Sequence, residues 1–184
     1  GKSKTNRGLA MSSLTHQRLQ EVLRYAPDTG VFIWQFSNSN RVRIGSVAGS
    51  PNSGKYILIS IDCKSYPAHR LAWFYVNGKW PDNEIDHING AKTDNRICNL
   101  RQATHAENCR NRSMKKTNTS GVKGVSRKGK INKWRAECMV NGKQHRVGLF
   151  TNLSEAEKAV RQFREIHHGE FANHGIGVEG KSHA

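Results

Sequence analysis

Apolar positions along this chain come in short runs separated by polar stretches, which predicts several small elements instead of one long helix or one large sheet. A short amphipathic pattern within residues 15–25 predicts one helix. Apolar runs at residues 31–34 and 56–61 predict two strands, with a Gly-, Ser- and Asn-rich stretch between them. We assign these elements to an N-terminal α+β module over residues 13–67.

A second module is predicted over residues 68–112. Residues 68–77 have a helical pattern that ends in helix-stop chemistry, with Gly78 followed by Pro81. A strand at 84–88, a long polar loop and a return strand at 97–101 come next. The sequence Thr-His-Ala-Glu at 104–107 is a capping box, which predicts the start of another helix. The module is therefore expected to be a strand-strand-helix clasp.

The third module, residues 120–173, follows a basic linker at 113–119. Three short strands with hairpin turns are predicted, because Asn141-Gly142 is a strong turn signal. Asn152 is expected to cap the following helix. The predicted apolar stripe of that helix consists of Ala156, Ala159, Val160, Phe163 and Ile166.

The predicted fold class is therefore α+β: a small modular protein with a strand-strand-helix motif and a C-terminal three-stranded sheet packed on one helix. The chain has 184 residues, 35% hydrophobic residues and a mean hydropathy of -0.73. These values favour several half-exposed modules over one well-buried core. Residues 1–12 are expected to form a disordered leader or basic tail, and residues 174–184 a C-terminal tail.

Charge indicates the kind of partner. Thirty Lys and Arg against fourteen Asp and Glu give a formal net charge of +16, which favours nucleic acid over an anionic membrane because the chain has no long apolar run. Between Arg110 and Arg146 lie twelve basic residues and one acid, Glu137. This bias favours a nucleic-acid surface over an ordinary solvated face. In the N-terminal module, Arg41, Arg43 and Lys55 either touch DNA backbone or belong to a sheet that only supports the second module.

The four cysteines, Cys63, Cys98, Cys109 and Cys138, include no Cys-x-x-Cys pair. A zinc ribbon and a disulfide framework are therefore not supported. We expect reduced, roughly buried thiols and a cytoplasmic setting, in a bacterial or phage-infected cell.

The most informative cluster begins with Asp86-His87. Asn99 follows thirteen positions after Asp86, and Asn108 twenty-two positions after it. Carboxylate and amide oxygens suit a hard divalent cation, and a histidine titrates near neutrality. Each residue alone has an ordinary explanation as a turn, cap or surface residue. Their joint spacing favours phosphodiester cleavage.

These residues, together with Ala68-His69-Arg70-Leu71, Asp94-Asn95-Arg96, Asn99-Leu100-Arg101 and Glu107-Asn108, resemble the HNH motif of phage and intron-encoded homing endonucleases. The third module resembles the plant ethylene-response-factor type of DNA-binding domain through Gly124-Val125, Lys133 to Glu137, Gly148 to Phe150 and Glu155-Ala156. In that comparison, Ser126 replaces an Arg and Arg146 replaces a Trp. Sequence preference is therefore not transferred.

The first resemblance implies that His87 is the general base, that Asp86 and Asn108 hold the metal, and that Asn99 is the middle Asn of the motif. The last position is often His in the family. Asn108 there favours Mg²⁺ or Mn²⁺ over zinc, with one ion per site. The expected DNA-binding residues are Arg101, Lys123, Arg127, Lys128, Lys133, Trp134, Arg135 and Arg146.

Some assignments stay open at this point. His69 is expected to be structural, packing against Trp73. Arg70 and Arg101 are each expected either to clamp a phosphate or to pair with Glu84 or Glu107. The main alternative function is a non-catalytic, sequence-specific DNA-binding regulator, and a second is an RNA-binding structural protein.

The sequence contains one Asp-His pair and no heptad repeat. We therefore expect a monomer on double-stranded DNA and a site-selective nick as the main product. Deletion after about Lys116 is expected to leave the nuclease module folded but poorly targeted.

Overall fold

The computed structural model describes residues 14–115 and 117–175. The predicted leader, and all but the first two residues of the predicted tail, therefore lie outside the described residues.

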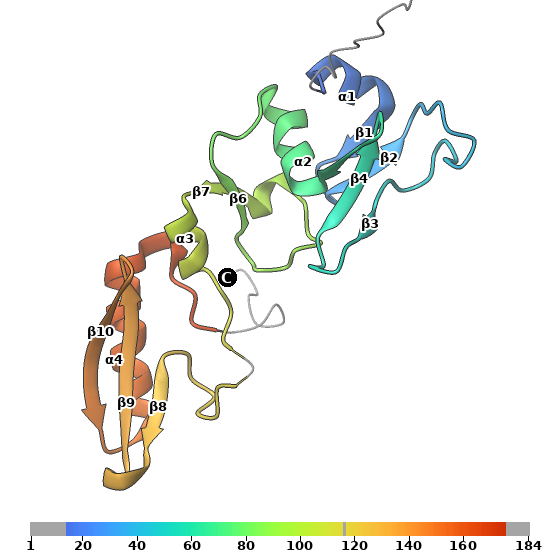
Figure 1. Cartoon of the computed structure of the whole chain (residues 1–184). Helices are drawn as coiled ribbons and strands as arrows, with labels where there is room; N and C mark the ends of the chain where they lie inside the picture. Colours follow the sequence, from blue (N-terminus) through green and yellow to red (C-terminus); the bar gives the residue numbers. More distant parts are fainter. Residues whose placement is uncertain (1–13, 116, 176–184) are drawn as a thin grey trace, which may run out of the picture.

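The chain is mixed α/β. Its first part contains α1 (His16–Val22), β1 (Leu23–Ala26), β2 (Val31–Trp34), β3 (Ser50–Pro51), β4 (Ile57–Ile61), β5 (Lys64–Pro67), α2 (Ala68–Asn77), β6 (Glu84–His87), η1 (Ile97–Asn99), β7 (Leu100–Ala103) and α3 (His105–Arg110). Its second part contains β8 (Val125–Lys128), η2 (Gly129–Ile131), β9 (Lys133–Val140), β10 (Lys143–Phe150), α4 (Leu153–His168) and η3 (Gly169–Phe171). Figure 1 shows the two parts joined end to end, with η3 (red) returning beside α3.

The first helix is shorter than predicted. The Thr15 side chain caps α1 by accepting the backbone N–H of Arg18. The helix ends at Val22 because residues 23–26 leave it to form β1, which pairs antiparallel with β2. This pairing places Leu23 and Tyr25 in the core. Tertiary pairing therefore overrides the local helical pattern.

The second helix has the predicted bounds, Ala68–Asn77. Gly78 ends it in the left-handed conformation with φ of 71°, which costs glycine little because it has no Cβ. Strand β4 lies within the predicted run. The turn after β4 is short, because Lys64 already begins β5, the strand that pairs antiparallel with β4.

One hydrophobic core spans the predicted boundary between residues 67 and 68. Leu71 of α2 and Ile85 of β6 belong to the same buried cluster as Leu19, Phe32 and Ile59 of the N-terminal elements. The first two predicted modules therefore share one hydrophobic core. Dividing residues 13–112 into two units had followed from local patterns, which do not show that two elements share a core.

The strand-strand-helix clasp comprises β6, β7 and α3, residues 84–110. The two strands are antiparallel, with Asp86 opposite Arg101 and His87 opposite Leu100. The return strand begins three residues later than predicted, because residues 97–99 form the 3-10 helix η1. The predicted capping box at the start of α3 is confirmed: Thr104 and Glu107 bond each other's backbone N–H reciprocally.

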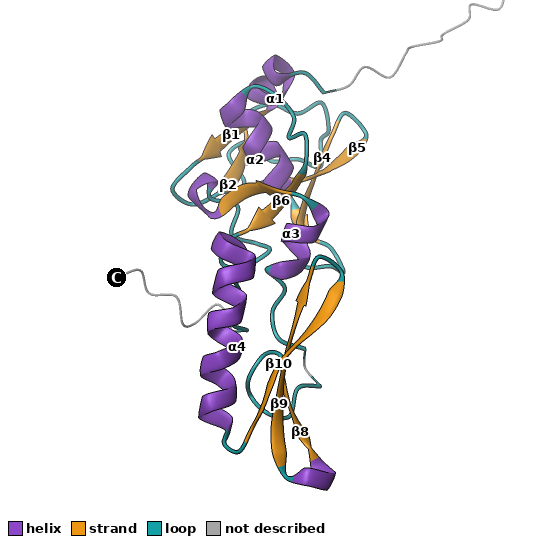
Figure 2. Cartoon of the chain, turned by 90° about the vertical axis from the view of Figure 1, so that its left-hand side faces the viewer, coloured by secondary structure: helices purple, strands orange, loops and turns teal. Residues whose placement is uncertain are grey.

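The C-terminal part is a three-stranded antiparallel sheet in the order β10-β9-β8 with α4 along one face (Figure 2). Its core is small, centred on Ala136, Ala156 and Val160, which are 0% exposed. The predicted turn between β9 and β10 has φ of 50° at Asn141 and 76° at Gly142. Ile166 was predicted in the apolar stripe of α4, but it is 79% exposed, so that assignment was wrong.

All four cysteines are free. Their predicted burial is wrong for Cys63 and Cys98, which are exposed, whereas Cys138 is buried. Within the described residues, no helix has both the length and the apolar character needed to cross a bilayer.

Candidate active site

The candidate active site is a cavity of about 470 Å³ beside β6 and α3. Asp86 and His87 line it from β6, and Asn108 lines it from α3. Tyr56, just before β4, and Asn111, the residue that ends α3, also line it. Asp86 and His87 are each 5% exposed. The clasp thus brings three of the four predicted catalytic or metal residues to one cavity.

The His87 ring is held through one nitrogen. Its Nε2 lies 3.1 Å from Oδ1 of Asn95, whose Nδ2 donates to the carbonyl of Thr93 at 3.4 Å. Since Oδ1 can only accept, Nε2 carries the proton in this arrangement. The lone pair of the neutral ring is then on Nδ1, where it can accept a proton.

The environment of His87 favours its neutral form. Burial lowers the pKa of the ring, and the Asn95 hydrogen bond and the nearby Asp86 and Asp94 carboxylates oppose that shift. The neighbouring His69 is affected more strongly: burial, with His87 as a smaller cause, lowers its pKa to about 3. The two rings meet edge to face, with centroids 5.1 Å apart.

His69 packs against a tyrosine as well as a histidine. Its ring centroid lies 5.3 Å from that of Tyr56, which lies 6.1 Å from that of His87. The ammonium of Lys92 lies 4.4 Å above the Tyr56 ring. Tyr56 and His69 thus form one wall of the His87 pocket, whereas packing against Trp73 had been predicted for His69.

Asn99, predicted as catalytic, lies beneath the loop that carries Asn95. Its Oδ1 accepts the backbone N–H of Asn89 at 3.0 Å, and its Nδ2 donates to Oδ1 of Asn89 at 3.1 Å and to the carbonyl of Asp94 at 2.8 Å. These side-chain partners all lie in this loop. Through these contacts, Asn99 is bonded to the loop that carries Asn95, the hydrogen-bond partner of His87.

The N-terminal elements support the same loop. The Tyr25 hydroxyl on β1 donates to the carbonyl of Asn95 at 2.7 Å, and burial raises the pKa of this hydroxyl to about 12. At Gly30, φ is +72° and an added Cβ would lie 2.4 Å from the Arg96 nitrogen. The turn before β2 therefore approaches the loop closely only because Gly30 has no side chain.

The Asp86 carboxylate has two side-chain partners. Arg101 donates to its Oδ2 from Nε at 3.0 Å and from Nη2 at 2.9 Å. Asn111 donates from Nδ2 to Oδ1 at 3.0 Å, to Oδ2 at 2.9 Å and to the His87 carbonyl at 2.8 Å. Arg101 was expected to clamp a phosphate or to pair with Glu84 or Glu107; the structure pairs it with Asp86.

The Asn108 side chain has a hydrogen-bond partner that the sequence did not predict. Its Nδ2 donates to Oε2 of Glu84 at 2.5 Å, so its amide oxygen is the atom left for a cation. This hydrogen bond is the largest cause that lowers the pKa of Glu84. Asp86 and Asn108 line the same cavity, but the amide that contacts Asp86 belongs to Asn111, one turn later.

The donor set at this cavity fits a hard divalent cation. Oδ1 of Asp86 accepts one hydrogen bond, against three at Oδ2, so it is the less occupied oxygen. The described residues contain no group of three or more His, Cys, Asp or Glu able to hold a metal. A carboxylate and an amide oxygen leave the remaining positions for water or phosphate, which suits Mg²⁺.

The predicted DNA-binding residues of the C-terminal part divide into two sets. Register places Arg135 of β9 opposite Ser126 of β8, and Lys133 opposite Lys128, on the side of the sheet away from Ala136 and α4. Arg146 lies opposite Glu137 on that same side. We call Lys128, Lys133, Arg135 and Arg146 the open face.

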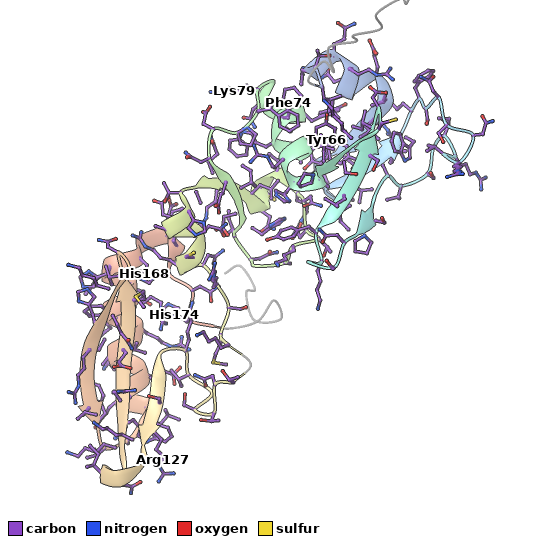
Figure 3. All side chains as sticks on the ribbon, viewed as in Figure 1. Tyr66, Phe74, Lys79, Arg127, His168 and His174 are labelled. Carbon is purple, nitrogen blue, oxygen red and sulfur yellow. The ribbon has the colours of Figure 1, made fainter. Side chains whose placement is uncertain are left out.

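The other three predicted contacts have different surroundings. Trp134 packs in the small core beside α4, and Arg127 lies over its ring at 5.6 Å. Figure 3 shows Arg127 at the end of the sheet far from α3. The Lys123 ammonium turns inward and donates to the carbonyls of Arg110, Arg112 and Asn173. Burial lowers the pKa of Lys123 to about 8.

Several residues of the site were not singled out from the sequence: Tyr25, Tyr56, Lys92, Asn111 and Asn173. Asn111 follows Asn108 by three positions, one helical turn, which is a usable signal. Asn95 was part of a quoted motif, but without an assigned role. Nothing local marks Tyr25 or Asn173, because each reaches the site only through the tertiary fold.

Comparison with known proteins agrees with this geometry. Residues 66–110 match the HNH endonuclease family, HNH_3. Protein 3.8 of Escherichia phage T7 is 37% identical over 105 residues, which cover 56% of this chain and 86% of the phage protein. An uncharacterized HNH endonuclease of Acanthamoeba polyphaga mimivirus is 33% identical over 116 residues, covering 62% of this chain and 59% of that protein. A second one from the same virus is 29% identical and covers 53% and 27%. No solved structure matches.

Proposed function

Because this chain carries an HNH endonuclease domain in residues 66–110 and belongs to the same family as protein 3.8 of phage T7, we propose that it is a divalent-metal-dependent DNA endonuclease of the homing type. It hydrolyses DNA phosphodiester bonds at the cavity beside β6 and α3. A DNA substrate is consistent with the formal net charge of +16.

The observation that carries the proposal is the state of His87. The ring is buried, its Nε2 is bonded to Asn95, and its pKa is lowered. It is therefore neutral at pH 7 with its Nδ1 lone pair available. A base that is fixed in one tautomer beside a carboxylate is what metal-assisted hydrolysis uses.

Asp86, through Oδ1, and Asn108, through its amide oxygen, are the residues that would hold one Mg²⁺ or Mn²⁺ ion. When bound, the ion supplies positive charge that stabilises the developing charge on the phosphate and the leaving oxygen. The choice of ion follows from the oxygen donors, which suit hard cations better than zinc.

The reaction balances with one water molecule. Nδ1 of His87 takes a proton from water, and the water oxygen forms a bond to phosphorus as the bond to the 3′ oxygen breaks. The products are a 5′ phosphate and a 3′ hydroxyl, the latter taking up one proton. Asn95 keeps the ring in the tautomer that can accept, and Asn99 holds the loop on which Asn95 lies.

The open face of the C-terminal sheet is the proposed surface for the DNA backbone. Lys128, Lys133 and Arg146 are exposed there. Arg135 is paired with Glu137 at 3.2 Å on the same face. The resemblance of the third module to the plant DNA-binding domain supports DNA binding by this side of the sheet. Phosphate contacts of this kind give affinity and position but little sequence information.

We further propose a monomer that nicks one strand, acting in a phage-infected cell. The single Asp-His pair supports one cut per binding event. The phage and mimivirus sources of the relatives support a viral setting.

The test is incubation of the chain with supercoiled plasmid, with Mg²⁺ and with a chelator. We expect open circles to accumulate before linear DNA, and only with the metal. Binding without cleavage under any divalent ion would overturn the proposal in favour of a DNA-binding regulator. Immediate linear product at low protein concentration would overturn the nickase assignment alone.

A further inference from the structure

We propose that Asn173, near the end of the described chain, is a positioning residue of the nuclease site, acting through Asn111 on the Asp86 carboxylate. This inference rests on the proposed function, because it names a residue that the same site needs. It assigns a role in the site to residues 170–175, which we call the closing segment. These residues lie 60 to 65 positions after the last residue of the HNH match, Arg110.

The argument begins with the Asn111 amide. Asn111 is 6% exposed, and its Nδ2 faces Asp86 and the His87 carbonyl. If the amide were turned over, its oxygen would face a carboxylate and a carbonyl, and like partial charges would repel. The orientation of this one amide therefore decides whether the Asp86 carboxylate is held or pushed away.

Asn173 fixes that orientation. It is 5% exposed, and its Nδ2 donates to Oδ1 of Asn111 at 3.1 Å and to the Asn111 carbonyl at 2.7 Å. Its own Oδ1 accepts the backbone N–H of Gly175 at 2.7 Å. A backbone N–H can only donate, so the Gly175 N–H fixes which way the Asn173 amide faces. The Asn173 amide in turn fixes the orientation of the Asn111 amide, which donates to Asp86.

The second partner of Asp86 is held by the same segment. Arg101 donates from Nη1 to the Glu170 carbonyl at 2.9 Å, and its guanidinium carbon lies 3.7 Å from the centroid of the Phe171 ring. Both side chains that bond the carboxylate, Arg101 and Asn111, are therefore tied to residues 170–175.

The closing segment is itself fastened to the clasp. The Lys123 ammonium bridges the carbonyls of Arg110 and Arg112, at the end of α3, and that of Asn173. At Gly175, φ is +86° and an added Cβ would lie 3.0 Å from Cβ of Lys123 and of Met114. Glycine thus permits the close approach that brings its N–H to Asn173.

The test is Asn173→Asp in the full chain, with Asn152→Asp as the matched control. The variant replaces a donor by a carboxylate facing Oδ1 of Asn111, so the Asn111 amide is expected to turn over. The control makes the same chemical change at the N-cap of α4, where Asp caps as well as Asn. We expect the metal-dependent cleavage rate at saturating DNA to fall about 10- to 100-fold for Asn173→Asp, with DNA affinity unchanged.

Two further readouts separate positioning from folding. The Mn²⁺ concentration for half-maximal cleavage should rise about 10- to 100-fold with Asn173→Asp. In NMR spectra of the metal-free protein, the side-chain NH₂ signals of Asn111 should move away from their carboxylate-bonded position, and thermal unfolding should remain cooperative. If Asn173→Asp does not fold, Asn173→Ser takes its place, because it removes the amide without adding charge. The same changes in cleavage rate, Mn²⁺ requirement and Asn111 signals are expected, but smaller.

If these variants keep the wild-type cleavage rate, metal dependence and Asn111 signals, the proposal is overturned, while the nuclease function stays intact. If the wild-type chain cuts no DNA, the proposed function fails, and the Asn111 signals still decide whether Asn173 orients that amide.

Discussion

Asp86 in the clasp is 5% exposed and is bonded by two side chains that are each held by further partners. Lys133 on the C-terminal sheet is exposed and lies opposite another exposed lysine, Lys128. Both regions are rich in polar side chains, but only the first fixes their geometry. Chemistry at one phosphorus atom needs fixed groups, whereas attraction to a polyanion needs charge at roughly the right place.

The two regions also differ in how they are built. The clasp shares its core with the N-terminal elements and takes its polar supports from both ends of the chain. The C-terminal sheet has its own core of alanine and valine under α4. We therefore expect changes in the clasp to alter rates and changes on the open face to alter affinity.

The largest expected effect is on the base. His87→Ala should lower the cleavage rate about 10² to 10⁴-fold, the usual contribution of a positioned base, with DNA affinity nearly unchanged. The matched control is His105→Ala, since His105 lines the same cavity but is an exposed residue bonded to Glu84. Single-turnover cleavage measures both. Loss in the control, with His87→Ala active, would move the base to His105.

The metal assignment gives the next effect. Asp86→Asn keeps the shape of the side chain, and Asn108→Ala removes the amide oxygen. Each should weaken Mn²⁺ binding to the protein–DNA complex about 10-fold or more, and the double variant should lose much less than the sum, because both residues hold one ion. Calorimetry on the complex is the measurement. Unchanged binding in both single variants would show that the ion lies elsewhere.

The clasp was predictable as a set of elements because its signals are local. Gly78 and Pro81 stop α2, the helix that precedes the clasp, and Thr104 with Glu107 starts α3, so each of these ends depends on residues close in sequence. The spacing of Asp86, His87 and Asn108 placed them in one cavity for the same reason.

The supports of the site were not predictable in that way. Asn173 and Tyr25 lie far along the chain from the residues they hold, and nothing in their sequence neighbourhood marks a partner. Lys123 illustrates the opposite error: in the sequence it is one more residue of a basic run, but in the fold its ammonium is bonded to three carbonyls. The deletion after about Lys116, which was expected to leave the nuclease module folded, would also remove the closing segment, which contacts Arg101 and Asn111.

Salt dependence separates outward from inward lysines. If the four residues of the open face neutralise four phosphates, replacing all four by Gln should reduce the slope of log affinity against log salt by about 3.6. Lys123→Met should leave that slope unchanged and instead lower the thermal unfolding midpoint, because three carbonyls lose their donor. A slope that responds equally to Lys123 would contradict the inward placement.

The smallest effect concerns acid stability. The pKa of His69 is about 3 in the folded chain, below the ordinary 6.5, so the unfolded state alone takes up its proton between those values. The free energy of unfolding that comes from burying the neutral His69 ring is therefore fully present above pH 6.5 and is lost as the pH falls. At pH 5 the loss should be about 2 kcal/mol. Denaturant unfolding of wild type and His69→Gln at pH 7.5 and 5 measures it; equal losses in both would exclude His69 as the cause.

One paired measurement tests the distinction between geometry and charge most directly. Cleavage rate at saturating protein and DNA affinity are determined for Asn173→Asp and for the four-residue open-face variant. We predict that the first loses rate at unchanged affinity, and that the second loses affinity at unchanged saturated rate. If both variants reduce only the rate, or both reduce only the affinity, the clasp does not determine the rate and the sheet the affinity. The distinction between the two regions is then contradicted.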